Sequence, residues 1–426
     1  MEARAHGRRR RPRPFLLGGI TATLALLVAL FPLACTQGCY QNRYLGSVPA
    51  GVPEVRVLLL EGRTSVSLSA TEQPNIRVGS GPNRPINLSG GASVPITLTS
   101  VGWKIGSAMV GSGTLIIQPA SQGSVKIDRR AYRGHFRLIP IGSGKFDVIN
   151  DVDVDGYLMS VVPREMFPQW PIEAYKAQAI VARTYALYVA RTAPMGTNFD
   201  LFADTRSQVY GGIHDESAKS REAVDSTRGM VVVYGPAGQE HIFKAYFSSC
   251  CGGVTQSAND AFGDPILEPL SARNIGPRCV ESTHFNWGPV VIRKTELTRR
   301  IRMWGASNDA PEKTIGDVSR IDIGRSNQFG RPSEFIITDA RGYRYSLNSE
   351  DFRHAVDTGA SDGATLPSSF CKPVNDATSV HFTEGHGFGH GVGLCQWCAE
   401  HEANAGASHE SIVLDAFPHA KLVRAY

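Results

Sequence analysis

The chain has 426 residues, 42% of them hydrophobic, and a formal net charge of +5. This length predicts one large domain or two linked domains. Residues 1–14 hold six Arg and one Glu, which account for the whole net charge and leave 38 basic and 38 acidic residues elsewhere. A neutral remainder excludes the basic surface of a nucleic-acid-binding protein, so we expect no nucleic acid among its partners.

The N-terminal segment predicts export from the cytoplasm. The basic stretch "RRRRPRP" precedes twenty uncharged residues, from Phe15 to Ala34, which are enough to span a bilayer or to form a long signal core. The positive-inside bias places the rest of the chain outside the cytoplasm. "PLAC" before Cys35 resembles a lipoprotein cleavage box, although Pro32 stands where Leu is usual. We expect attachment to the outer face of the inner membrane, with anchor, lipoprotein and secreted forms left open.

Residues 54–150 predict a strand-rich region that follows a short tether. Short β-like runs are broken by Gly, Pro and Asn, and their alternation favours antiparallel pairing. The runs are "VRVLLL", "SVSLSA", "VPITLTS", "GTLIIQP", "SVKID", "HFRLIPI" and "KFDVI".

The longest predicted helix covers residues 171–191. It opens with Pro171, a residue type that is favoured at the first helical position. Lys176 and Arg183 fall on one side, which we expect to be solvated. The opposite side carries a buried stripe at spacings of three and four. The stripe consists of Ala177, Val181, Thr184 and Tyr188.

Strands and helices alternate irregularly in the rest of the chain. Helices are predicted at "SAKSREAVDSTRG", "ELTRRIRMWG" and "QWCAEHEANAG", and strands at "MVVVYG", "HIFKAYFSS", "VSRIDIG" and "EFIITDA". This mixture predicts the α+β class. We expect a head, anchor and tether at 1–53, a strand-rich region at 54–150, and a mixed catalytic region at 151–426 built around a substrate groove.

The stretch "GHGFGHGVGLCQW", residues 385–397, places glycine at every second position. Glycine in a helix interior costs about 1 kcal/mol, so we expect an extended strand. In a strand, His386, Phe388, His390 and Val392 would share one face, and the bare opposite face would suit another chain segment or a ligand. The two His would lie roughly 13 Å apart, too far to share one metal ion. The pattern favours a groove for a polar polymer.

Glu165 is the only acidic residue in "YLMSVVPREMFPQWP", residues 157–171. The prolines in this stretch predict a stiff loop. Apolar neighbours disfavour the charged form of a carboxyl group and raise its pKa, as a general acid requires at neutral pH. The alternative is a Glu that stabilises the start of the following helix. Asp151, Asp153 and Asp155 lie upstream, but none is obviously paired with Glu165.

Eight cysteines in an exported chain predict disulfides or a structural metal site. Cys395 and Cys398 form C-x-x-C, which is half a zinc site or a tight disulfide. Cys251 and Cys279 are the predicted partners, with Cys250 and His284 as further candidates. Disulfides are slightly favoured because of export. A zinc hydrolase is a weaker hypothesis, since the sequence has no H-E-x-x-H pattern.

Four stretches occur in the order typical of one protein family. They are "DGYLMSVVPREMFPQWPIEAYKAQAIVARTYALY", "DTRSQVYGG", "SSCCGGVTQS" and the glycine stretch. From about residue 155 to residue 422 the chain resembles stage II sporulation protein D and its relatives, which include proteins called amidase enhancers. Two positions depart from the family: Phe247 stands where many relatives have His, and Cys398 where Gly is usual.

The resemblance implies a lytic transglycosylase that acts on peptidoglycan glycan strands, with Glu165 as the catalytic acid and no cofactor required for catalysis. It also implies that His386, His390 and Gln396 line the glycan groove, with Lys176, Arg183 and Gln208 as weaker candidates. The rival hypothesis is a non-catalytic glycan-binding protein that recruits or activates a cell-wall amidase.

Overall fold

The computed structural model describes residues 51–426, apart from 85, 87, 89–90, 121–122 and 362. The predicted anchor at residues 15–34 lies outside the described residues. Within the described part of the chain, no helix is both long enough and apolar enough to cross a membrane.

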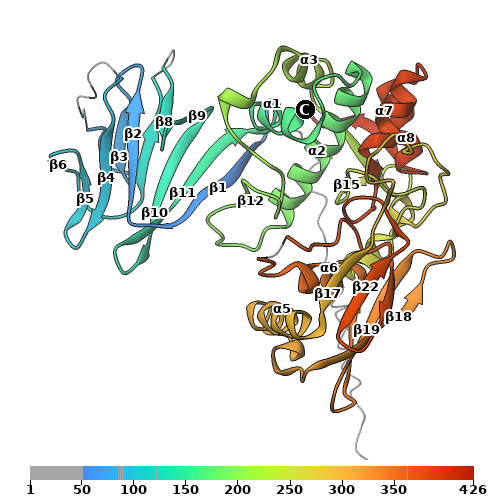
Figure 1. Cartoon of the computed structure of the whole chain (residues 1–426). Coiled ribbons are helices and arrows are strands. Elements are labelled where there is room, and N and C mark those ends of the chain that lie inside the picture. The colour runs from blue at the N-terminus through green and yellow to red at the C-terminus, as the bar shows by residue number, and fades with distance from the viewer. Residues whose placement is uncertain (1–50, 85, 87, 89–90, 121–122, 362) are drawn as a thin grey trace, which may run out of the picture. The chain divides into compact units, whose positions relative to one another are not determined.

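Two six-stranded sheets build most of the N-terminal region (Figure 1). The first has the order β12 (Leu201–Phe202), β1 (Glu54–Arg63), β11 (Lys145–Asp153), β10 (His135–Gly142), β7 (Leu115–Gln118), β3 (Asn75–Val78). The second has the order β6 (Ala108–Met109), β5 (Gly102–Ile105), β4 (Val94–Thr99), β2 (Ser65–Ala70), β8 (Val125–Ile127), β9 (Arg130–Tyr132). All seven predicted runs form strands, which confirms the strand-rich region.

Side chains from both sheets meet in one core. Trp103 of β5 lies edge-on against Phe146 of β11, with ring centroids 4.9 Å apart, and both are fully buried. The alternation along the strands explains this core, because successive side chains of a strand point to opposite faces. In β2, for example, Val66, Leu68 and Ala70 are buried while the serines between them are more exposed.

The same core continues into the helices that follow. It includes Val55 of β1, Tyr157 of α1 (Val154–Glu165) and Ala182 of α2 (Ile172–Thr192). β1 pairs antiparallel with β11 and parallel with β12, so the first strand lies between two segments that are distant in sequence. The domain boundary that we predicted at residue 150 falls inside β11.

Helix α2 is confirmed, but it is buried on more than one side. One set of its side chains belongs to the core shared with the sheets, and another set, including Ala177 and Val181, packs with Val392 and Leu394. The other helices are α3 (Ala218–Ser226), α4 (Ala258–Phe262), α5 (Lys294–Ser307), α6 (Ser349–Asp357), α7 (Gln396–Asn404) and α8 (His409–Ala416). Short 3-10 turns are η2 (Ile213–Asp215), η3 (Glu268–Leu270) and η4 (Pro311–Thr314).

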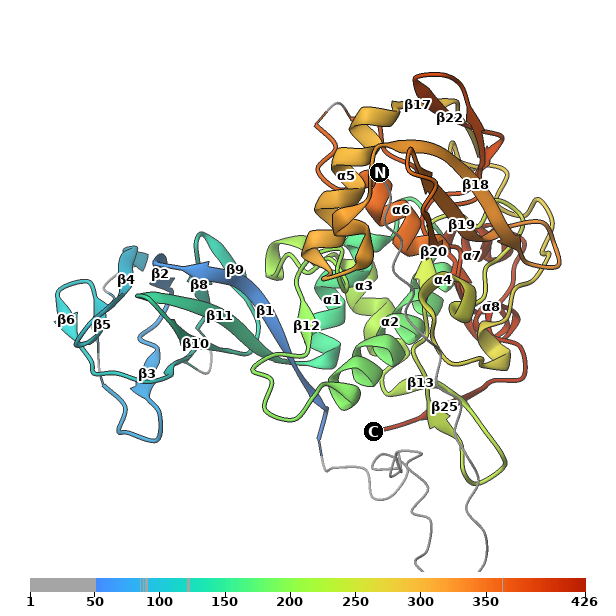
Figure 2. The same ribbon diagram turned by 90° about the horizontal axis from the view of Figure 1, so that it is seen from below.

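Small sheets complete the fold. Three of them each have three strands. In the first, β13 (Met230–Tyr234) lies between β14 (His241–Ile242) and β25 (Lys421–Arg424), and Figure 2 shows β13 beside β25. The second has the order β17 (Val290–Arg293), β22 (Ser379–Thr383), β21 (Lys372–Asn375). The third has the order β18 (Val318–Ser326), β19 (Pro332–Asp339), β20 (Arg344–Asn348).

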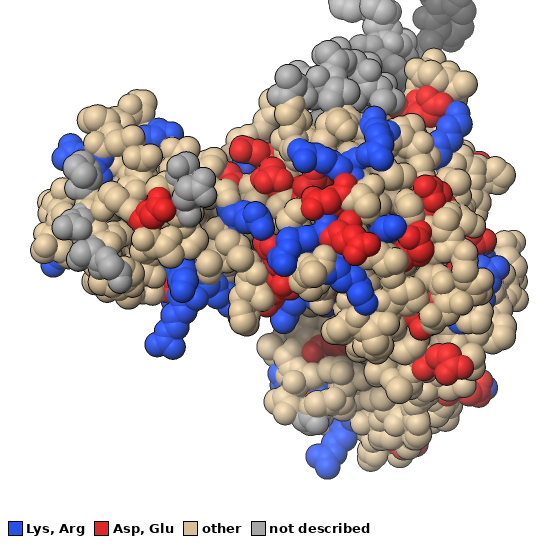
Figure 3. Space-filling view, turned by 90° about the horizontal axis from the view of Figure 1, so that it is seen from above, with Lys and Arg blue, Asp and Glu red and all other residues tan. Residues whose placement is uncertain are grey.

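Two strand pairs hold the segments that carry the sequence motifs. β15 (Phe247–Ser248) is parallel to β24 (Leu394–Cys395), and β16 (Asn286–Trp287) is antiparallel to β23 (Gly385–His386). The mixture of separate sheets and helices makes the chain α+β, as predicted. Figure 3 shows acidic and basic side chains interspersed over one face of the molecule.

Candidate active site

Glu165 is the last residue of α1, and the structure corrects the predicted loop. Helix α1 runs through Tyr157 and includes Pro163 in its last turn. Proline lacks the N–H that would bond to the carbonyl of Met159, four residues earlier. The Ser220 hydroxyl of α3 donates to that carbonyl at 2.9 Å. The side chain of Ser220 therefore replaces the missing helical hydrogen bond, and the helix continues to Glu165.

The short connection from α1 to α2 is fixed by two side chains. The Tyr175 hydroxyl donates to the carbonyls of Met166 and Phe167, at 3.3 and 3.1 Å. The Lys219 ammonium donates to the carbonyls of Pro168 and Trp170, at 2.6 and 2.9 Å. These bonds satisfy backbone carbonyls that no regular secondary structure pairs, so the backbone beside Glu165 is held in one conformation.

Three aromatic rings from segments that flank Glu165 and Gln396 in the chain form a cluster. Phe167 and Trp170 come from the connection between α1 and α2, and Trp397 comes from α7. The ring centroids lie 5.0 Å apart for Phe167 and Trp170, 5.1 Å for Trp170 and Trp397, and 5.9 Å for Phe167 and Trp397. Phe167 is 49% exposed and Trp170 only 3%, so Phe167 is the ring of this group that faces solvent most. We call the group of three rings the aromatic cluster.

The Glu165 side chain is partly exposed and has two hydrogen-bond donors. The Val209 backbone N–H donates to Oε1 at 3.2 Å, and the Gln396 side chain makes the second bond. Burial raises the pKa of Glu165 above its ordinary value, while these two bonds oppose the rise without cancelling it. Glu165 also lies at the C-terminal end of α1, where the helix dipole disfavours a negative charge. Helix α2 begins only at Ile172, and the acidic residue in its first turn is Glu173, so the alternative that Glu165 stabilises the start of that helix is wrong.

The upstream aspartates lie at the other end of α1. Asp155 is ten residues before Glu165, which corresponds to about 15 Å along a helix. Asp153 caps the N-terminus of the helix by accepting from the Gly156 N–H. Asp151 pairs with His135 and Arg137. Among the interactions of residues 51–426 described here, none joins a second carboxylate to Glu165.

The glycine stretch brings Gln396 to Glu165, but its backbone differs from the predicted strand. Gly387, Gly389, Gly391 and Gly393 all have positive φ, between 70° and 88°. Only glycine adopts this conformation without strain, which is why glycine occurs at alternate positions. The bare side approaches other protein segments: a Cβ on Gly387 would overlap the Cys250 carbonyl, and one on Gly391 the Arg331 guanidinium.

The side chains of this stretch consequently have separate neighbours. His386 lies against Phe370 and Phe388 against His284, at 5.0 and 4.6 Å between ring centroids. His390 lies edge-on against both Tyr246 and Phe262, whose rings stack on each other. Burial lowers the pKa of His390 to about 4, and its Nδ1 accepts from the Val392 N–H at 3.0 Å. His390 is therefore neutral at pH 7. In the described part of the chain, Gln396 bonds to Glu165, whereas no such interaction joins His386 or His390 to it.

The three weaker candidates have structural partners. Arg183 is fully buried and donates to Asp155 at 3.0 Å, so the solvated face that we predicted for it is wrong. The reason is that α2 packs on several sides. Gln208 is buried and accepts from the Tyr157 hydroxyl at 3.1 Å. Lys176 donates to Glu173 at 2.8 Å, on the side of α2 that contacts α8.

A hollow of about 380 Å³ lies around Arg302, Asp317 and Arg341, and its lining does not include Glu165. The substrate groove stays a prediction.

Sequence reasoning missed two features of this site. The Val209 N–H reaches Glu165 from 44 residues away, and backbone donors leave no signal in a sequence. Trp397 was part of the quoted motif, but its contact with Trp170 depends on tertiary packing. The position of Trp397 directly after Gln396 in the sequence was the signal that could have indicated its place near the site.

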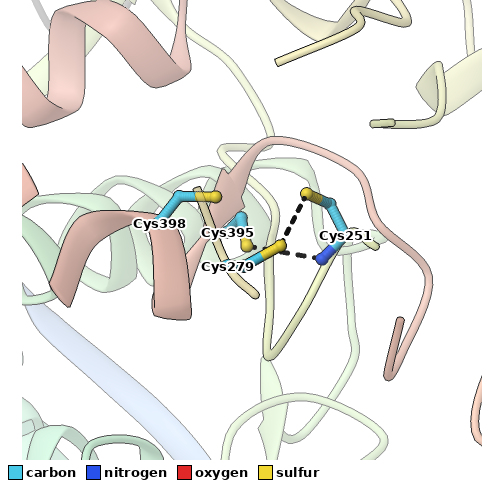
Figure 4. Close-up of side chains that lie close together, drawn as sticks. All are labelled: Cys251, Cys279, Cys395 and Cys398. Atoms are coloured by element: carbon cyan, nitrogen blue, oxygen red, sulfur yellow. Dashed lines mark hydrogen bonds between the residues drawn. The ribbon is translucent and has the colours of Figure 1, made fainter. Parts of the chain in front are cut away.

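The four predicted thiols, Cys251, Cys279, Cys395 and Cys398, lie together (Figure 4). All are buried, and their Sγ atoms lie within 4.8 Å of one another. Cys251 and Cys279 have Sγ atoms 3.6 Å apart. The Cys250 Sγ instead donates to the Cys279 carbonyl, and His284 lies against Phe388. We call the group of four the thiol cluster.

Comparison with known proteins identifies relatives of the chain. The family model described as "Stage II sporulation protein" matches residues 142–234, which include α1, α2 and Glu165. An uncharacterized protein of Brachyspira hyodysenteriae is 29% identical over 66% of this chain and 69% of its own. Stage II sporulation protein D of Bacillus subtilis is 25% identical over 77% of this chain and 85% of its own.

The amidase enhancer of Bacillus subtilis is 24% identical over 61% of this chain, and the match spans only 39% of that longer protein. Residues 142–234 thus match the stage II sporulation protein family, and the chain is similar to proteins named stage II sporulation protein D and amidase enhancer.

Proposed function

We propose that the protein is a lytic transglycosylase that cleaves peptidoglycan between N-acetylmuramic acid and N-acetylglucosamine. The observation that carries this proposal is Glu165: a partly exposed carboxyl group with a raised pKa, two residues before the exposed ring of Phe167. A raised pKa favours the protonated form that a general acid needs. Aromatic surfaces suit the apolar faces of sugar rings, so Phe167 would lie against the glycan.

One carboxyl group suffices for the reaction. Protonated Glu165 donates its proton to the glycosidic oxygen, and the bond from that oxygen to C1 of muramic acid breaks. The resulting carboxylate accepts the proton of the muramic 6-hydroxyl, whose oxygen bonds to C1 and closes a 1,6-anhydro ring. Glu165 regains its proton and no water is consumed. Hydrolysis by ordinary glycosidases needs two carboxylates, whereas this intramolecular route needs only Glu165.

The first prediction is that Glu165→Gln abolishes the chemistry but not the binding. The amide keeps the shape of the side chain and cannot exchange the proton. General acid–base catalysis contributes about 10²- to 10⁴-fold, so release of anhydro-muropeptides should fall by at least ~100-fold. Chromatography of products from intact peptidoglycan and from glycan stripped of stem peptides measures this fall. Co-sedimentation with the same glycan should be unchanged.

Glu222→Gln is the matched control, because Glu222 is exposed on the neighbouring helix α3. It should retain full activity. Equal product yields from native protein and Glu165→Gln would refute the proposal. In that case the second candidate function gains support: a glycan-binding protein that enhances a cell-wall amidase, as the name of one relative suggests. That protein would still stimulate the amidase when residue 165 is Gln.

We further propose that the mature protein is attached to the outer face of the inner membrane through its N-terminal segment. The twenty uncharged residues before Cys35 support this location. Fractionated cells should retain the protein with membranes. Recovery of the intact mature protein from the culture medium would contradict membrane attachment and leave the enzymatic proposal untouched.

A further inference from the structure

We propose that the thiol cluster binds one structural zinc ion, and that this ion fixes the start of α7, where Gln396 and Trp397 reach Glu165 and the aromatic cluster. The inference concerns the metal site and does not depend on the proposed enzymatic activity.

The positions of the sulfur atoms match a tetrahedral site. Zn–S bonds of about 2.3 Å place the four sulfur atoms of such a site roughly 3.8 Å apart. The Cys251–Cys279 separation is 3.6 Å, and all four Sγ atoms lie within 4.8 Å of one another. A disulfide joins two sulfur atoms at about 2.05 Å and leaves each with one partner. Here every sulfur atom is near three others, as a shared ion requires. Figure 4 shows the four side chains converging.

The ligand spacing agrees with this geometry. Cys395 caps the N-terminus of α7, and Cys398 lies in its first turn, so C-x-x-C forms a compact knuckle. Cys251 follows β15, which pairs with the strand that contains Cys395. Cys279 comes from the loop before β16. Three segments that are distant in sequence therefore supply the ligands, and one ion would tie them together.

Four thiolates around Zn²⁺ have a net charge of −2, and the surroundings of the cluster offset this charge. The Cys251 backbone N–H donates to the Cys395 Sγ at 3.3 Å. The N-terminus of α7 adds the positive end of a helix dipole. Arg331 is fully buried, and its guanidinium donates to the Cys251 carbonyl at 3.0 Å. A buried cation this close to the cluster favours an anionic metal site.

The chain links the thiol cluster to the candidate catalytic group through Gln396, which bonds to Glu165. Gln396 and Trp397 stand between Cys395 and Cys398 in the chain. The backbone N–H of Trp397 donates to the carbonyl of Ser249 at 3.1 Å, and Ser249 lies two residues before Cys251. The ion would therefore hold the two residues that contact Glu165 and Trp170.

The test is metal and thiol analysis of the full chain, purified in detergent without added metal or chelator. Mass spectrometry of metals should find one zinc per chain. Peptide mapping after alkylation under denaturing conditions with a chelator should find Cys251, Cys279, Cys395 and Cys398 all reduced. Replacement of zinc by cobalt should give the intense visible bands of a tetrahedral cobalt–thiolate site.

Variants locate the ion. Cys398→Ser should lose most of the bound zinc, whereas Cys398→His should keep it, because Cys₃His is also a zinc ligand set. The matched control is Cys371→Ser, since Cys371 is equally buried but belongs to another core. It should retain one zinc per chain. The cobalt spectrum of the native chain tests the site even if Cys398→Ser fails to fold.

Three outcomes would overturn the proposal: disulfides within the cluster, four reduced thiols without metal, or zinc retained in full by a folded Cys398→Ser. Iron in place of zinc would also contradict it. Loss of anhydro-product formation is not used as a criterion, so a failure of the zinc site and a failure of the proposed activity are distinguishable.

Discussion

The acidity of Glu165 depends on a balance between burial and two hydrogen bonds. Burial raises the pKa, and the bonds from Val209 and Gln396 lower it. A carboxyl group with a raised pKa favours the folded state at low pH, and this contribution is lost as pH rises through the folded-state pKa. The protonated form that donates to the glycan is lost over the same interval. We therefore expect activity to fall as pH rises, and the fall should occur at a higher pH than the titration of an ordinary Glu.

Changing Gln396 to Leu should shift this fall to higher pH. The variant removes a hydrogen bond that stabilises the carboxylate, so the protonated form of Glu165 persists to higher pH. A hydrogen bond to a charged group contributes ~1.5–3 kcal/mol, and ~1.4 kcal/mol corresponds to one pH unit, so we expect a shift of roughly one to two units. Initial rates of anhydro-product release across pH measure it. Gln169→Leu is the control, because Gln169 is exposed in the same connection. A shift to lower pH would refute the assigned role of Gln396.

At the scale of elements, the glycine stretch is shaped by contacts rather than by a strand ladder. Its bare side lies against residues 250–252, Arg331 and the Tyr246 carbonyl. Gly391 fits because a side chain there would meet a buried guanidinium that donates to the carbonyls of Cys251, Val254 and His390. The packing of several segments thus depends on the close contact between the Gly391 backbone and Arg331.

Gly391→Ala should therefore destabilise the protein more than the same change at Gly263. The two glycines have nearly equal φ, +71° and +73°, but Gly263 has nothing within 4 Å of an added Cβ. The left-handed conformation costs Ala about 1–2 kcal/mol at both positions. Displacing Arg331 should add at least ~2 kcal/mol at Gly391. Urea unfolding measures the difference in the free energy of unfolding. Equal losses would show that Arg331 shifts without cost.

At the scale of the whole molecule, the strand-rich region and the helices share a core. The bond from Arg56 of β1 to Asp200 joins the same two parts at the edge of the sheet. Because β11 spans residues 145–153, a cut at residue 150 would break that strand and uncover Val152, Val154 and Tyr157.

A fragment of residues 151–426 should consequently fold poorly. It lacks β1 and most of β11, so the apolar side of α1 would face water. We expect it to aggregate, or to exchange amide hydrogens in α1 and α2 far faster than the full chain does. Hydrogen-exchange mass spectrometry compares the two. A soluble fragment with native protection in α1 would show that the helical part folds on its own.

Several features were predictable from the sequence because their causes are local. The strands of residues 54–150 follow from alternation, and α2 follows from its stripe and from Pro171. The position of Glu165 at a helix end was not predictable, since the Ser220 hydroxyl that compensates for Pro163 lies 57 residues away. The burial of Arg183 depends on Asp155, 28 residues upstream. The meeting of Cys251 with Cys398 depends likewise on the β15–β24 pairing.

The contact between Trp170 and Trp397 gives the site an intrinsic fluorescent probe. The two indoles lie 5.1 Å apart at 73°, one beside Glu165 in the chain and the other beside Gln396. Indole emission responds to water and to nearby polar groups, so a sugar that covers Phe167 would change the fluorescence of the pair. Binding of a muropeptide can thus be followed without a label, and Trp397→Phe should remove most of the signal.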